Sequence, residues 1–165
     1  AGGVRYPAGG AAFVFVTGGP GSGKTLLGLE MVARQWLYGP PDSTCLYYSV
    51  EHTPQSLYRK LAFDFGYYGA DAEIEVLPEE VPQKLTIAAR RPEGTSHLVI
   101  TQAHPATLAE PGHGSSVDID WILAEIGNHR RANPVAIACV DNIGLLLTDL
   151  DYFGKRRALL ATRRQ

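Results

Sequence analysis

Residues 12–25 read AFVFVTGGPGSGKT, and this stretch decides the fold. Its first six residues form an apolar run rich in valine and phenylalanine, which is typical of a strand buried on both faces. A glycine-rich turn follows, and apolar residues then recur at helical spacing at Leu26, Leu27, Leu29, Met31, Val32 and Trp36. A buried strand, a glycine-rich loop and an amphipathic helix in this order predict an α/β domain.

The glycine-rich turn fits the phosphate-binding pattern Gly-x-x-x-x-Gly-Lys-Thr at every required position. Glycines permit positive φ angles, so backbone N–H groups can surround a phosphate, and the start of the following helix adds its positive dipole end. A lysine at position 24 can reach the β- and γ-phosphates of a nucleotide, and the hydroxyl of Thr25 can coordinate Mg²⁺. We therefore expect a nucleotide site with a catalytic role for Lys24, lined by Gly18, Gly19, Pro20, Gly21, Ser22, Gly23, Lys24, Thr25 and Leu26.

Two further apolar runs are predicted to be buried strands, and an acidic residue follows each. Residues 45–50 (CLYYSV) lead to Glu51, and residues 135–140 (VAIACV) lead to Asp141. In an open parallel sheet the carboxyl ends of the strands converge on the ligand crevice. Asp141 is thus placed to bind Mg²⁺, and Glu51 to orient and deprotonate a water molecule that attacks the γ-phosphate. The structural alternatives are a turn-capping aspartate and a solvated or helix-capping glutamate.

The rest of the chain alternates predicted helices and strands. Thr53 and Pro54 supply an N-cap and a first-turn proline for a helix that reaches about residue 65. Beyond it we expect a strand over 73–77, a helix over 81–90, a strand over 96–101, a loop over 102–117, a helix over 118–131 and a basic helix from about 154. The pattern indicates one domain over residues 1–165, with a mainly parallel β-sheet flanked by helices on both faces.

Composition excludes several classes of protein. Hydrophobic residues make up 45% and charged residues 19% of the 165 residues, so the chain is not expected to be disordered. No apolar run approaches the roughly 20 residues of a membrane helix, and the first residues do not resemble a signal peptide. A net charge of -2 argues against nucleic-acid binding over the whole surface. Cys45 and Cys139 lie in apolar runs and are predicted to be buried thiols, which favours a cytoplasmic protein.

Three segments carry a resemblance to a known family: residues 18–25 (GGPGSGKT), 47–66 (YYSVEHTPQSLYRKLAFDFG) and 135–144 (VAIACVDNIG). Together they resemble the ATPase core of RecA and of KaiC, the circadian-clock ATPase. The KaiC-like branch is the more similar, because its second strand ends in a glutamate that is followed by a Thr-Pro-rich helix and a Phe-Gly pair. RecA has Glu-His where this sequence has Glu51-His52. The resemblance spans residues 14 to about 161, although 71–116 match only in outline.

The resemblance implies a RecA-like P-loop NTPase that binds and hydrolyses ATP with Mg²⁺. It implies a switch or motor within a homo-oligomer, either a hexameric ring or a filament. Lys24 and Thr25 would bind phosphate and Mg²⁺, Glu51 would be the catalytic base, and Asp141 would be the Walker B aspartate.

The sequence departs from the family at two places. Many KaiC proteins have a second glutamate where His52 stands, and we interpret His52 as a surface or helix-capping histidine. The family also has a later strand that lies between the P-loop strand and the Walker B strand, and the sequence ends before it. We therefore expect a domain without its C-terminal strands, with little or no ATPase activity on its own.

Four other functions fit parts of the sequence less well. A DNA-dependent recombinase or helicase shares the fold, but the acidic charge balance disfavours DNA binding. A non-hydrolysing, ATP-sensing regulatory module differs from a hydrolase in not needing Glu51. Residues 141–144 satisfy the Asp-x-x-Gly pattern of GTPases, yet no Asn-Lys-x-Asp motif occurs. A small-molecule kinase is disfavoured because no arginine-rich lid insertion is evident.

Some conspicuous side chains are interpreted as structural. His104 and His113 lie in a proline-rich stretch without nearby cysteines, so an ordinary loop is favoured over a metal site. The tyrosines are expected to pack the sheet and its helices rather than to stack on bases; they are Tyr47, Tyr48, Tyr67 and Tyr68.

Overall fold

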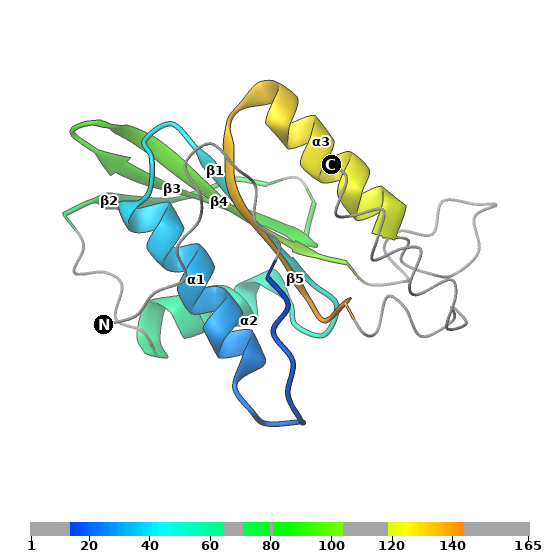
Figure 1. The fold of residues 1–165 in the computed structure, drawn as a ribbon. Coiled ribbons are helices and arrows are strands. Elements are labelled where there is room, and N and C mark those ends of the chain that lie inside the picture. Colours follow the sequence, from blue (N-terminus) through cyan, green and yellow to red (C-terminus); the bar gives the residue numbers. More distant parts are fainter. Residues whose placement is uncertain (1–13, 65–70, 80, 104–118, 144–165) are drawn as a thin grey trace.

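The computed structural model describes residues 14–64, 71–79, 81–103 and 119–143 (Figure 1). Three α-helices and five strands lie in these ranges, together with a π-helical turn that continues α2. In chain order they are α1 (Lys24–Tyr38), β1 (Thr44–Ser49), α2 (Pro54–Arg59), η1 (Lys60–Asp64), β2 (Glu73–Leu77), β3 (Lys84–Arg91), β4 (Gly94–Gln102), α3 (Ile119–Ala132) and β5 (Val135–Asp141). The predicted basic helix from residue 154 and most of the predicted 102–117 loop lie outside the described residues.

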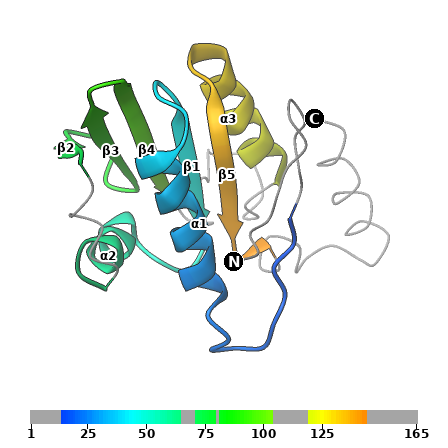
Figure 2. The same cartoon turned by 60° about the vertical axis from the view of Figure 1, so that its left-hand side comes forward.

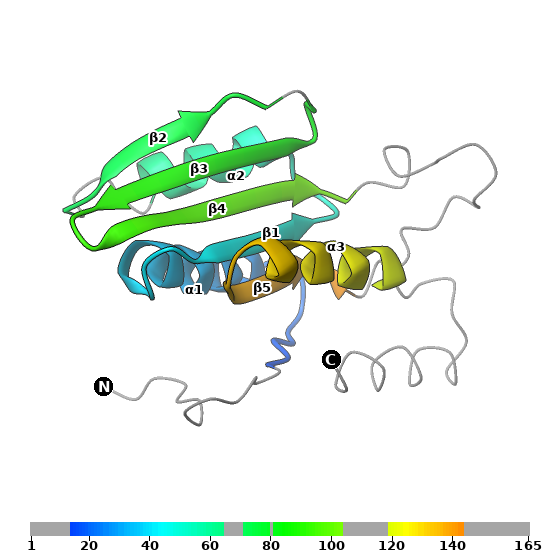
Figure 3. The same ribbon diagram turned by 90° about the horizontal axis from the view of Figure 1, so that it is seen from above.

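The strands form one mixed sheet in the order β2-β3-β4-β1-β5 (Figure 3). β1 pairs in parallel with β4 on one side and with β5 on the other, whereas β3 is antiparallel to both β2 and β4. The α/β class is confirmed, but the prediction of a mainly parallel sheet is not, because half of the described strand pairings are antiparallel. A tight connection turns β3 back into β4, and Gly94 at the start of β4 has φ 148°, a value that residues other than glycine rarely adopt.

Two of the predicted elements are wrong. The sequence predicts a helix over 81–90. Instead, residues 84–91 (KLTIAARR) form strand β3. Alanine, leucine, lysine and arginine favour helices, but this segment is hydrogen-bonded to a strand on each side and buries Ile87, Ala88 and Ala89. Tertiary pairing therefore overrides the intrinsic helix propensity.

The predicted strand before the glycine-rich loop is the second error. Residues 14–17 are not a strand, and 12 and 13 lie outside the described residues. The side chains of Val14, Phe15 and Val16 are 44%, 53% and 42% exposed rather than buried. A strand needs a neighbour for its backbone N–H and C=O groups, and β5 is the last strand on this side of the described sheet. Figure 2 shows the segment outside the sheet, beside the tip of β5.

Two apolar clusters cover the two faces of the sheet, as expected for helices on both sides. On one face α1 and α2 pack against the sheet, with Leu29, Trp36 and Leu57 buried. On the other face Ile122 of α3 packs against β1 and β4. Alternate residues of β1 enter the two clusters, so β1 is the central strand of the core. Among the described residues, no helix combines the length and the apolar character that crossing a membrane requires.

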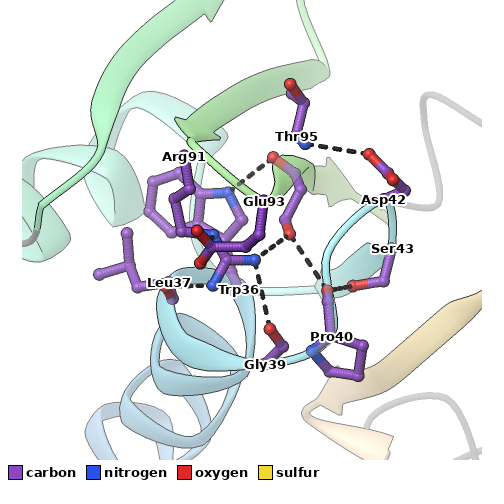
Figure 4. A network of polar contacts seen from close by, with 10 residues as sticks. Trp36, Leu37, Gly39, Pro40, Asp42, Ser43, Arg91, Glu93 and Thr95 are labelled. Atoms are coloured by element: carbon purple, nitrogen blue, oxygen red, sulfur yellow. Dashed lines mark hydrogen bonds and ion pairs between the residues drawn. The ribbon is translucent and has the colours of Figure 1, made fainter.

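The C-terminal end of α1 is held by a buried arginine of β3 (Figure 4). Nη1 of Arg91 donates to the carbonyl of Leu37 at 2.8 Å, and Nη2 donates to the carbonyl of Gly39 at 3.2 Å and to Oγ of Ser96 at 2.8 Å. The arginine side chain is only 7% exposed. Because the last carbonyls of a helix carry partial negative charge, a guanidinium there satisfies them and stabilises the helix. This contact fixes α1 against the sheet at the end far from the glycine-rich loop.

Arg91→Met is expected to lower the free energy of unfolding by about 1–3 kcal/mol, because it leaves buried carbonyl and hydroxyl acceptors unpaired. The measurement is urea unfolding followed by circular dichroism. Arg90→Met is the matched control, since Arg90 is the preceding residue and forms an exposed ion pair with Glu75. The loss for Arg90→Met should be much smaller. Equal losses for the two variants would contradict the capping role of Arg91.

Candidate functional site

The glycine-rich loop has the backbone conformation that a phosphate cradle needs. Gly21 and Gly23 have φ angles of 72° and 84°, which strain any residue with a side chain. α1 begins at Lys24, and its N-cap Gly23 has no side chain to occupy the first N–H groups of the helix. A Cβ added at Gly19, Gly21 or Gly23 would meet no described atom within 4 Å, so the loop backbone is not packed against other described parts of the chain. A helix start without a side-chain cap and an open loop suit an anion.

The ammonium group of Lys24 turns back onto the loop. Its Nζ donates to the carbonyl oxygens of Gly18 at 2.9 Å and Gly19 at 2.8 Å, and to Oγ of Ser22 at 3.4 Å. A Cβ on Gly18 would lie 2.5 Å from Oγ of Ser22, so a side chain at position 18 would displace the serine. The structure therefore brings Gly18, Ser22 and Lys24 together around one positive charge.

Three other predicted site residues lie in the loop or in the first turn of α1. Pro20 is exposed in the loop, Thr25 is a half-buried residue in the first turn of α1, and Leu26 is exposed beside it.

The two predicted carboxylates leave neighbouring strands side by side. Ser49 at the end of β1 is paired with Asp141 at the end of β5, and the N–H of Val50 donates to the carbonyl of Asp141 at 2.8 Å. Glu51 therefore lies two residues beyond its strand rather than directly after it. Nδ2 of Asn142 donates to Oε1 of Glu51 at 3.2 Å, which links the exposed glutamate to the end of β5. The peptide bond between Asp141 and Asn142 is cis.

The carboxylate of Asp141 has a partner that the sequence did not predict. Oη of Tyr47 donates to Oδ2 of Asp141 at 2.8 Å, from a side chain that is fully buried. Burial, followed by the nearby Cys139 and Asp141, raises the pKa of the Tyr47 phenol, so it stays protonated and acts as the donor. The strand register that brings the two residues together could not be read from the sequence, which predicted only that Tyr47 packs in the core.

A close approach of α1 to the sheet places the loop near these strand ends. Gly28 faces the sheet, since a Cβ there would lie 3.1 Å from Sγ of Cys139 and 3.6 Å from Oη of Tyr47. Gly28 is one helical turn beyond Lys24. Figure 2 shows α1 beginning at the end of the sheet toward which β5 points. The loop and the two carboxylates thus lie at the same end of the described sheet, which is where a ligand crevice would lie.

The histidine after Glu51 does not cap a helix. Thr53 is the N-cap of α2, and its hydroxyl accepts from the N–H of Ser56 at 3.3 Å. The backbone N–H of His52 donates to Oγ of Ser49, and its side chain is half-buried. His104 and His113 lie outside the described residues.

The oxygen donors near the loop are those that Mg²⁺ prefers. Within the described ranges, no three side chains of His, Cys, Asp or Glu gather to hold a metal by themselves. A nucleotide-bound Mg²⁺ takes only one or two protein oxygens and completes its octahedron with phosphates and water. The hydroxyl of Thr25 and the carboxylate of Asp141 fit that requirement in chemical type.

Comparisons with known proteins give no match to this chain, whether with protein-family models, with curated proteins or with solved structures. The likeness to RecA and KaiC therefore rests on the sequence motifs alone.

Both cysteines are free, Cys45 buried and Cys139 half-buried. Burial raises the pKa of each thiol to about 12, and the charge of Asp141 adds to the rise at Cys139. We expect neither thiol to react with Ellman's reagent at about pH 8 in the native protein, because the thiolate is the reactive form. In concentrated urea both should react at the rate of a free thiol. Fast labelling of the native protein would contradict this.

Proposed function

We propose that this chain binds Mg-ATP and hydrolyses it when it is assembled in a homo-oligomer, as a P-loop ATPase of the RecA and KaiC type. The observation that carries the proposal is the placement of Glu51 and Asp141 on adjacent strand ends, at the end of the sheet where the loop and Lys24 begin α1. A phosphate cradle, a lysine, an oxygen ligand for Mg²⁺ and a carboxylate base are the parts that phosphoryl transfer to water requires.

In this proposal the backbone binds and orients the triphosphate. The N–H groups of the loop and of the first turn of α1 donate to phosphate oxygens, and Lys24 exchanges the carbonyls of Gly18 and Gly19 for the β- and γ-phosphates. Thr25 and Asp141 would hold Mg²⁺, which would neutralise charge that develops on the phosphate oxygens.

Glu51 acts as the base. Its carboxylate accepts a proton from the water molecule whose oxygen forms a bond to the γ-phosphorus. The bond between the γ-phosphorus and the β–γ bridging oxygen breaks, which releases ADP and inorganic phosphate. The hydrogen bond from Asn142 keeps Glu51 beside the end of β5 during this step.

We further propose a homo-oligomer, because in the family that the sequence resembles nucleotide lies between subunits of a ring or filament. The two free cysteines favour a cytoplasmic location. An ATP-sensing module is the second candidate. The observation in its favour is that Val14, Phe15 and Val16 are exposed and lie outside the sheet directly before the loop, since a sensor needs a segment whose packing changes when nucleotide binds.

Lys24→Ala should weaken binding of a non-hydrolysable Mg-ATP analogue by about 10- to 100-fold, because a hydrogen bond from a charged group contributes roughly 1.5–3 kcal/mol. Isothermal calorimetry measures the dissociation constant. Arg34→Ala is the control, since it removes a positive charge from the exposed face of the same helix. Equal affinity in the wild type and Lys24→Ala would contradict the phosphate role of Lys24.

In the assembled homo-oligomer, Glu51→Gln should lower ATP turnover by about 100-fold while binding stays unchanged, because the amide still accepts from Asn142 but cannot take a proton. Release of inorganic phosphate measures turnover. Glu73→Gln, on the far edge strand β2, is the matched control. If the wild type and both variants bind ATP tightly but none of them turns it over, the result would favour the sensing module.

A further inference from the structure

We propose that Tyr47 is a positioning residue for Mg²⁺, because its hydroxyl fixes the carboxylate of Asp141 in the orientation that binds the cation. The inference rests on the proposed function. It goes beyond it by assigning a role in metal affinity to a core tyrosine that neither the motifs nor the resemblance single out.

Strand pairing and core packing fix the position of the Tyr47 hydroxyl. Tyr47 is on the central strand β1, opposite Cys139 of β5, and its ring belongs to the apolar cluster beneath α1. Side chains alternate along a strand, so Asp141, two residues beyond Cys139, extends from the same face of the sheet. The 2.8 Å bond from Oη to Oδ2 of Asp141 therefore joins neighbouring side chains across two paired strands.

A buried phenol alone would explain why a hydrogen bond exists, but not why its acceptor is Asp141. The terminal torsion of an aspartate is soft, so a carboxylate at a strand end samples many orientations when nothing holds it. A bond to one oxygen from a fully buried ring removes that freedom and leaves further lone pairs of the carboxylate for a cation. Residues that orient a metal ligand in this way typically contribute about 10- to 100-fold to metal affinity.

The contact with α1 extends the same effect to the second proposed ligand. Gly28 lies over the phenol, because a Cβ built on this glycine would be 3.6 Å from Oη and 3.7 Å from Cε2 of Tyr47. Thr25 lies three residues earlier on the same helix. Tyr47 is thus hydrogen-bonded to Asp141 and packed beneath the helix that carries Thr25, so it connects the elements of both proposed Mg²⁺ ligands.

Tyr47→Phe tests the proposal, because it keeps the ring and removes only the hydroxyl. The dissociation constant of Mn²⁺ as a stand-in for Mg²⁺, measured by electron paramagnetic resonance in the presence of ATP analogue, should rise about 10-fold. Binding of the analogue in EDTA should not change. In turnover the KM for Mg²⁺ should rise while kcat at saturating Mg²⁺ is retained, so excess Mg²⁺ rescues the variant.

Tyr48→Phe is the matched control. Tyr48 is the next residue of β1 and equally buried, but it extends from the opposite face, where its ring packs edge-on against Trp121. The control should leave the metal affinity unchanged. In an Asp141→Asn background, Tyr47→Phe should have no further effect on metal affinity, because the charge that the hydroxyl orients is absent.

The outcomes separate this inference from the proposed function. If the wild type binds the analogue with Mg²⁺ dependence and Tyr47→Phe matches Tyr48→Phe, the positioning role is overturned and the proposed function stands. This holds whether both variants keep the metal affinity of the wild type or both lose the same amount of it, since an equal loss would reflect general loosening of β1. If the wild type shows no metal-dependent nucleotide binding, the proposed function and this inference both fail.

Discussion

The parallel register of β1 against β5 is the constraint on which the candidate site depends. It sets Ser49 opposite Asp141 and Tyr47 opposite Cys139. Because side chains alternate along each strand, this register directs Tyr47 and Asp141 toward α1. A slip of one residue would turn Asp141 toward α3 and away from the helix that begins at the loop. The hydrogen bond from the N–H of Val50 to the carbonyl of Asp141 extends the pairing past the end of β1. The two segments that carry Glu51 and Asn142 therefore leave the sheet side by side.

The position of α1 follows from contacts at two points along its length. Near its start, Gly28 permits a close approach to β5 that any larger residue would oppose. At its other end, Arg91 and Ser96 hold the last turn, since Arg91 binds the terminal carbonyls and the carbonyl of Ser96 accepts from the indole of Trp36 at 3.2 Å. Neither contact touches the glycine-rich loop. Together they determine where the loop lies relative to the strand ends, although the segment before the loop is not in the sheet.

Strands β1, β4 and β5 could be predicted because their apolar runs are too short for helices and are bounded by turn residues. The same rule failed at 14–17, because an apolar run becomes a strand only where a neighbouring strand accepts its hydrogen bonds. It failed again at β3, whose alanines and arginines fit a helix equally well until pairing with β2 and β4 decides. The placement of Glu51 and Asp141 near adjacent strand ends could be predicted because strand ends can be read from the sequence. The contacts of Tyr47, Asn142 and Gly28 could not, because they depend on which strands are neighbours and in what register.

The charges at this end of the sheet explain why the proposed ATP binding should require a cation. Two carboxylates, Glu51 and Asp141, lie on adjacent strand ends, and the ammonium of Lys24 is already satisfied by loop oxygens. A triphosphate without metal would bring further negative charge toward both carboxylates, and like charges at short range repel. Lys24 offsets part of that repulsion, because a bond to phosphate is stronger than one to a neutral carbonyl. A divalent cation between the phosphates and Asp141 turns the remaining repulsion into attraction, so nucleotide and metal should each raise the affinity of the site for the other.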